Sequence, residues 1–162
     1  MKKLALLAAL LITAPLFATD ITVESVVAQL NVQRAERKLP PLRHDNRLAI
    51  AAADRIRDME EQGYWAHVGP DGNSPFRWLK PHGYDFWFAG ENLAAGFETA
   101  EVMVEGWMES KGHRDNILSP MYADCGIAIL EGSTTGRATG YSVVVIFGRE
   151  QPDLKPTKQA RK

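Results

Sequence analysis

Two stretches in the first half of the chain place side chains at the three- and four-residue spacing of a helix that covers a core. The first begins after Thr22, whose hydroxyl can cap a helix, and Pro40-Pro41 stops it. The second begins after Asp45 and ends at Gly63. The positions that carry the spacing are Val26, Val27, Leu30, Arg34, Leu48, Ala51, Ala52, Arg55, Ile56 and Met59. The pattern therefore predicts two helices before residue 64.

Turn residues and caps divide the middle of the chain. Ser74-Pro75 suits the start of a helix, because proline is favoured at the first helical position, and we expect a short helix that ends near Gly83. Residues 84–88 are dense in aromatic side chains and should be extended. Thr99 can cap a longer helix, which Gly112 should break just before His113.

The last third of the chain has the composition of strands. Residues 125–130 and 140–147 are apolar runs, and the segment 131–139 between them is rich in Gly, Ser and Thr, which predicts a hairpin loop. Helices followed by strands favour an α+β fold, with the helices packed on a small antiparallel sheet.

Both ends of the chain differ from this middle part. Lys2 and Lys3, an apolar run at 4–17 and the small residue Ala18 predict a signal peptide at 1–18. The run is shorter than the about 20 residues of a membrane-spanning helix, and we expect no membrane span in the mature chain. Residues 149–162 have little to bury and should form a flexible polar tail behind a domain at 22–148. We therefore expect a soluble exported protein, either periplasmic or secreted.

Composition and charge narrow the class further. The 162 residues are 45% hydrophobic and 24% charged, as in one ordinary globular domain. Without the two lysines of the signal peptide, 17 basic residues face 20 acidic ones, so the mature net charge of −3 argues against nucleic acid as a partner. The single cysteine, Cys125, excludes an intramolecular disulfide. Its place at the start of a strand fits a small buried side chain better than a nucleophile.

Three compact motifs carry the candidate chemistry. They read YWAH at 64–67, GENLA at 90–94 and GHRDNIL at 112–118, and they contribute His67, Glu91 and His113. Two imidazoles and a carboxylate can hold a divalent metal or polarise a water molecule. Gaps of 24 and 22 residues are too long for one helix face, so only the fold can bring these side chains together. The His-Glu-x-x-His pattern of zinc hydrolases is absent from the sequence.

In this order, the motifs closely resemble those of the CAP superfamily, also called SCP-like, and most of all its bacterial branch. The resemblance runs from about 26 to 148. It implies a three-layer α-β-α sandwich around a small central antiparallel sheet, with a cleft built from two histidines and two glutamates. His67, Glu91 and His113 match three members of that tetrad, and Ser110 stands where the second glutamate would be. The departure leaves a metal site open but removes one carboxylate from a two-carboxylate mechanism.

Each cleft residue has alternatives that the sequence leaves open. His67 and His113 could be metal ligands, with Zn²⁺ as the expected ion, or structural histidines bonded to loops. Glu91 could be a ligand, a general base or a residue that orients one imidazole, and orientation is favoured. Ser110 could belong to the cleft wall or act as a nucleophile with His113 as its base. A set of aromatic residues could line a groove, although packing in the core is favoured: Tyr84, Phe86, Trp87, Phe88, Trp65 and Trp78.

These observations favour a binding module over an enzyme. The cleft would hold a divalent cation together with a ligand from the envelope or surroundings, such as a lipid, another small molecule or a partner protein. The alternative is a metal-assisted hydrolase of peptide or cell-wall bonds, in which Glu91 accepts a proton from the metal-bound water. A third possibility is an interaction protein whose cleft has no remaining role.

Overall fold

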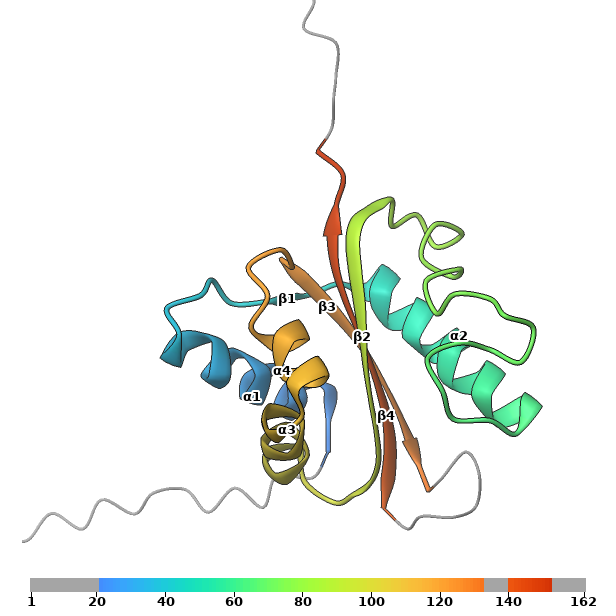
Figure 1. Ribbon diagram of the computed structural model, residues 1–162, viewed down its shortest axis with the longest axis horizontal. Helices are drawn as coiled ribbons and strands as arrows, with labels where there is room; N and C mark the ends of the chain where they lie inside the picture. The colour runs from blue at the N-terminus through green and yellow to red at the C-terminus, as the bar shows by residue number, and fades with distance from the viewer. Residues whose placement is uncertain (1–20, 133–139, 153–162) are drawn as a thin grey trace, which may run out of the picture.

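The computed structural model describes residues 21–132 and 140–152, and it arranges four helices around one four-stranded sheet (Figure 1). The elements are α1 (Val23–Glu36), β1 (Arg43–His44), α2 (Asn46–Gln62), β2 (Phe86–Phe97), α3 (Ala100–Glu109), α4 (Lys111–Ile117), β3 (Asp124–Glu131) and β4 (Tyr141–Glu150). The expected signal peptide, most of the loop at 131–139 and most of the expected tail lie outside the described residues. None of the helices within the described part of the chain is long and apolar enough to cross a membrane.

The strands lie in the order β1-β3-β4-β2. β4 pairs antiparallel with β2 and with β3, whereas β1 adds two residue pairs parallel to β3. The sheet is therefore mixed and not purely antiparallel as expected. The sequence gives no indication of β1, because a strand of two residues is too short for a periodic pattern. The expected α+β class is confirmed.

The sheet is the middle of three layers, with α2 on one face and α1, α3 and α4 on the other (Figure 1). Alternate residues of β4 enter two separate cores: Val143 and Val145 face α1 and α3, whereas Val144 and Ile146 face α2. Burial on both faces explains the continuous apolar run of this strand. Cys125 belongs to the first core and is fully buried, as its sequence context predicts.

The predicted helix caps are present. The Thr22 hydroxyl accepts a hydrogen bond from the Ser25 amide, and the Asp45 carboxylate accepts one from the Arg47 amide. Gly63 ends α2 in the left-handed region, with φ of 67°. These contacts are local, which is why the sequence reveals them.

Three expectations are wrong. Residues 75–83 form successive turns instead of a helix, because Pro81 has no amide hydrogen and its ring would clash with the preceding helical turn. Gly112 does not break a helix before His113, since the break lies at Ser110 and both residues belong to α4. The strand β4 continues through Glu150, two residues into the segment expected to be a loose tail.

The edge strand β2 is covered by side chains instead of another strand. Its outward carbonyl groups at 89, 91 and 93 accept hydrogen bonds from Tyr122 Oη (3.2 Å), Asn116 Nδ2 (3.0 Å) and Trp107 Nε1 (3.0 Å). These donors belong to α3, α4 and the segment after α4. They satisfy an edge that would otherwise offer free carbonyls to another chain, and they fix α4 against β2.

Gly126 allows α2 to approach β3 closely. A Cβ atom at this position would overlap backbone atoms of Leu48 and Ala49. We expect Gly126→Ala to lower the free energy of unfolding by about 3 kcal/mol and the melting temperature by roughly 10 °C, because a backbone cannot rotate away from the clash. Calorimetry or urea denaturation measures the change.

The matched control is Gly112→Ala, at a helical glycine around which an added Cβ would meet nothing within 4 Å. Alanine there should be neutral or stabilise by roughly 0.5–1 kcal/mol. Equal stability of the Gly126→Ala and wild-type proteins would contradict the close packing.

Candidate functional site

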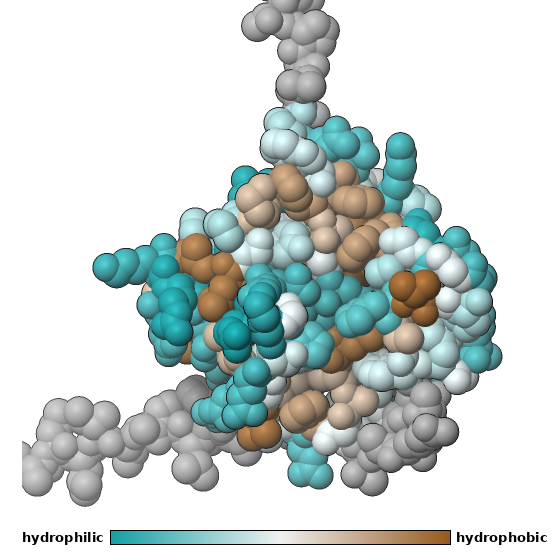
Figure 2. Space-filling model, viewed as in Figure 1, coloured by the Kyte–Doolittle hydropathy of each residue, from teal (hydrophilic) through white to brown (hydrophobic). Residues whose placement is uncertain are grey.

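The four cleft residues predicted from the sequence line one open pocket of about 510 Å³. The lining residues are His67, Pro75, Phe76, Glu91, Ser110, Gly112, His113 and Asn116. The pocket lies between the 64–83 segment and α4, at the edge strand β2. Seen from the side of Figure 1, hydrophilic side chains gather between α4 and α2 and are bordered by apolar patches (Figure 2).

His67 is tied to β2 through Glu91. Its Nδ1–H donates to Glu91 Oε1 at 2.8 Å, and the side chain of His67 is 54% exposed whereas that of Glu91 is 2% exposed. The hydrogen bond to Glu91 raises the pKa of His67 above its usual 6.5, and burial opposes the rise. The other face of the ring is open to the pocket.

His113 is held by its backbone. Asn92 Nδ2 donates to the His113 carbonyl at 3.2 Å, and Asn116 Nδ2 donates to Asn92 Oδ1 at 2.9 Å. Burial lowers the pKa of His113 below 6.5, and the neighbouring His67 lowers it further. The two pKa values are therefore shifted in opposite directions, and His67 is the readier of the two imidazoles to carry a proton.

Adjacent residues of β2 thus serve opposite sides of the site. Successive side chains of a strand point to opposite faces, so Glu91 faces the α2 layer and Asn92 faces the α3–α4 layer. Each of them positions one histidine, and the two rings meet with centroids 6.5 Å apart at an angle of 54°.

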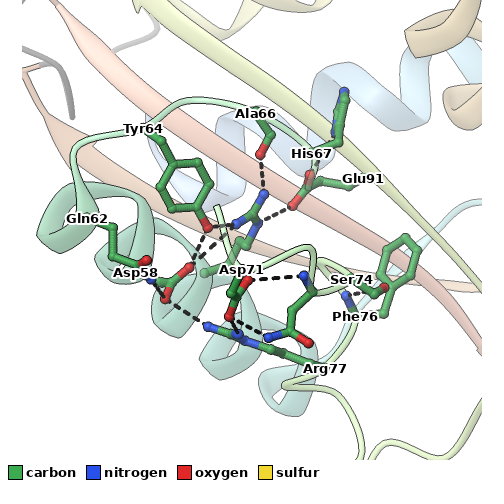
Figure 3. Close-up of polar contacts among 12 residues, drawn as sticks. Asp58, Gln62, Tyr64, Ala66, His67, Asp71, Ser74, Phe76, Arg77 and Glu91 are labelled. Carbon is green, nitrogen blue, oxygen red and sulfur yellow. Dashed lines mark hydrogen bonds and ion pairs between the residues drawn. The ribbon is translucent and has the colours of Figure 1, made fainter. Parts of the chain in front are cut away.

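A buried arginine completes the site on the α2 side. Arg55 Nε donates to Glu91 Oε2 at 3.0 Å, and the two side chains are 1% and 2% exposed. The same guanidinium donates to Tyr64 Oη and to the Ala66 carbonyl, one residue before His67. In Figure 3, Tyr64, the Ala66 carbonyl and the Glu91 carboxylate surround this point, and His67 lies on the far side of Glu91.

Further ion pairs fasten the segment that carries His67. Arg77 donates to Asp58 Oδ1 at 2.8 Å and to Asp71 Oδ2 at 2.7 Å (Figure 3). Hydrogen bonds from the Asn73 amide and side chain, together with Arg77, lower the pKa of Asp71 to about 2. Asp71 therefore stays ionised at neutral pH and holds Arg77, which in turn ties the turns at 69–77 to Asp58 of α2.

The nucleophile hypotheses find no support in the geometry. Ser110 is exposed at the junction of α3 and α4, and within the described residues no hydrogen bond joins its hydroxyl to His113. Glu109, the carboxylate directly before Ser110 in the sequence, is exposed and does not line the pocket. Burial raises the pKa of Cys125 to about 12, so its thiol stays protonated.

His67 and His113 are the pocket residues that could hold a cation, with solvent completing its coordination. Both oxygens of Glu91 are engaged, by His67 and by Arg55. Across the ranges 21–132 and 140–152, no group of three or more His, Cys, Asp and Glu residues is arranged to hold a metal ion. Two imidazoles on one tetrahedral zinc ion would have centroids about 5 Å apart, given metal–nitrogen distances near 2 Å. The two rings, whose centroids are 6.5 Å apart, would therefore have to approach by roughly 1 Å.

The sequence did not identify Arg55, Asn92 and Asn116 as site residues. The available signal was an arginine at a core-facing position of α2, because a buried guanidinium requires buried acceptors. Of the six aromatic candidates, none lines the pocket, which instead uses Phe76. Tyr84 is fully buried and Trp87 is 57% exposed.

The opposite pKa shifts predict opposite pH dependences of stability. A raised pKa in the folded state means that the His67 contribution is complete below 6.5 and is lost as the pH rises through that pKa. A lowered pKa means that the His113 contribution is complete above 6.5 and is lost as the pH falls. We therefore expect His67→Ala to cost more stability at about pH 5 than at about pH 8, and His113→Ala to do the reverse.

Urea denaturation of the wild type and both variants at the two pH values measures these differences. NMR titration of the wild-type imidazoles supplies the control, with the His67 pKa expected above that of His113. The same pH trend in both variants would contradict the prediction.

Comparison with known proteins identifies relatives of this chain. Two are from Bacillus subtilis (strain 168): the uncharacterized protein YkwD, 37% identical over 111 residues, and the uncharacterized membrane protein YlbC, 34% identical over 99 residues. The matches cover 68% and 61% of this chain but only 43% and 29% of those proteins, so the chain spans less than half the length of either relative.

Solved structures share the fold. An extracellular protein containing an SCP domain from Bacillus anthracis str. Ames has a TM-score of 0.65 and 26% identity, over 78% of this chain and 40% of that one. An outer surface protein from Borrelia burgdorferi has a TM-score of 0.68 and 20% identity, over 82% of this chain and 98% of that one. At 20% identity, the similarity to the Borrelia burgdorferi protein shows a shared fold alone.

The family assignment comes from the sequence as a whole. The model of the cysteine-rich secretory protein family, CAP, matches residues 27–147, which is well over half of the chain and confirms the resemblance drawn from the motifs. The chain therefore belongs to the cysteine-rich secretory protein (CAP) family.

Proposed function

We propose that this protein is an exported binding module whose pocket holds a divalent cation, preferably Zn²⁺, between His67 and His113. The observation that carries the proposal is the pair of imidazoles 6.5 Å apart, each positioned by a neighbouring residue of β2. Neutral imidazole is a common zinc ligand when its other nitrogen donates to a carboxylate, and Glu91 fulfils this condition for His67.

A cation on two histidines would keep coordination positions for a ligand. Phe76 and Pro75 give the pocket an apolar wall, and Asn116 and Ser110 add polar groups. Such a lining suits a molecule with an oxygen-rich head and an apolar part, such as a lipid or a segment of a partner protein from the envelope or surroundings.

Export follows from the predicted signal peptide at 1–18. The structural neighbour described as an extracellular protein containing an SCP domain, which is 26% identical, supports export. A location in the periplasm and release into the medium both fit these observations.

The geometry supports binding better than hydrolysis. A general base needs a free lone pair directed at the attacking water. Both oxygens of Glu91 already accept hydrogen bonds, and Arg55 stabilises its charge in the interior. No second carboxylate lines the pocket among the described residues. Metal-assisted hydrolysis is therefore the less favoured function, and an assay for turnover tests it.

Zinc titration of the purified mature protein tests the cation site. We expect one Zn²⁺ per chain, and at least a tenfold loss of affinity in both His67→Ala and His113→Ala, because each removes half of the protein ligands. Mg²⁺ should not compete, since it prefers oxygen ligands. Calorimetry gives the affinity, and a rise in melting temperature with Zn²⁺ gives an independent measure.

The control is His44→Ala, at an exposed histidine of β1 outside the pocket. It should bind zinc as the wild type does. Equal zinc affinity in all four proteins would rule out the site.

Incubation with envelope lipid extracts and with peptide and peptidoglycan libraries tests the ligand. We expect capture of a lipid or peptide by the zinc-loaded wild type without turnover, and weaker capture by His113→Ala. Mass spectrometry identifies both bound and cleaved molecules. Turnover that disappears in Glu91→Gln would favour a hydrolase and contradict the binding module.

A further inference from the structure

We propose that Arg55 is the positioning residue of the pocket. Acting through Glu91, it fixes the neutral His67 ring with its proton on Nδ1 and leaves Nε2 bare. Arg55 lies on α2 and does not line the pocket, and among the described residues no hydrogen bond joins it to the His67 ring. It acts through Glu91, which accepts from Arg55 with one carboxylate oxygen and from His67 with the other.

The guanidinium of Arg55 joins three segments at one point. Its Nε donates to Glu91 Oε2 on β2, and its two terminal nitrogens donate to Tyr64 Oη and to the Ala66 carbonyl. The side chain is 1% exposed, so water cannot replace these partners. A planar fork of fixed donors suits three acceptors in three directions, which a lysine ammonium on a flexible stem cannot match.

The proton position on His67 follows from this arrangement. Arginine has no acceptor atom, so whatever group faces Arg55 Nε must present a lone pair. Oε2 of Glu91 fulfils that need, and Oε1 remains to accept from His67 Nδ1 at 2.8 Å. A neutral imidazole carries one proton, so Nε2 is then unprotonated. In Figure 3 the far nitrogen of the His67 ring points away from Glu91.

The backbone contact adds a second constraint. Ala66 directly precedes His67, and its carbonyl accepts from the same guanidinium that holds Glu91. The buried guanidinium of Arg55 therefore fixes the His67 ring through Glu91 and the backbone next to His67 through Ala66. The consequence for zinc rests on the proposed function, because a bare Nε2 is the atom that would bind the ion.

The isosteric variant Glu91→Gln tests the proposal. An amide has one acceptor oxygen. Arg55 Nε will donate to that oxygen, which turns the amide NH₂ toward His67 Nδ1. Nδ1 must then accept, so the proton moves to Nε2. We expect ¹⁵N NMR of the imidazoles at about pH 8 to show Nδ1–H in the wild type and Nε2–H in the variant. Zinc affinity should fall by about 10- to 100-fold.

Glu109→Gln is the matched control, since the same change at an exposed carboxylate outside the pocket should leave the His67 signals unaltered. If Glu91→Gln retains Nδ1–H, then its amide oxygen faces His67, Arg55 does not govern the orientation, and the proposal is overturned. Inversion of the tautomer in a protein that binds no zinc would support the role of Arg55 and refute the cation site alone.

A second variant keeps the positive charge at position 55 and removes the planar guanidinium. In Arg55→Lys the Glu91 carboxylate should no longer be held against His67, so we expect the His67 signals of two mixed tautomers. Arg57→Lys, at an exposed arginine of the same helix, should give the wild-type spectrum. A single Nδ1–H tautomer in Arg55→Lys would show that charge suffices and would overturn the proposal. This variant also decides the matter if Glu91→Gln does not fold.

Discussion

The buried ion pair between Arg55 and Glu91 is the interaction on which the site depends. Both side chains are almost inaccessible to solvent, so each charge would cost several kcal/mol without the other, and loss of one partner costs about 3–5 kcal/mol. The exposed pair of Arg57 and Asp54 on the same helix is of a kind worth about 0–1 kcal/mol. The buried pair also joins α2 to the edge strand β2, so the position of the helix and the orientation of His67 are fixed by the same contact.

The edge position of β2 explains why the pocket can exist. A central strand has neighbours on both sides, whereas β2 leaves one edge free for side chains from α3, α4 and the segment after α4. The alternation of a strand sends Glu91 into one layer and Asn92 into the other. One histidine therefore reaches the edge from the α2 side and the other from the α4 side, and they meet where the three layers come together.

Local signals in the sequence predict much of the fold but little of the site's support. Thr22, Asp45 and Gly63 mark helix ends through contacts with residues a few positions away. The segment at 75–83 shows the limit of such signals, because a good start at Ser74-Pro75 is offset by Pro81. The spacing that places Arg55 on the inner face of α2 is correct, yet its acceptor lies 36 residues away on another element.

The sequence by itself determined which residues could do chemistry here, the helices that local spacing and caps specify, and the strands that β-branched runs specify. Only the tertiary structure decided that His67 and His113, 46 residues apart, share one pocket, and that Glu91 gives one oxygen to an arginine and the other to an imidazole. The physical reason is the sequence distance over which the interactions act. Periodicity and capping act over a few residues, whereas the geometry of a pocket comes from layers packed by contacts that no local pattern encodes.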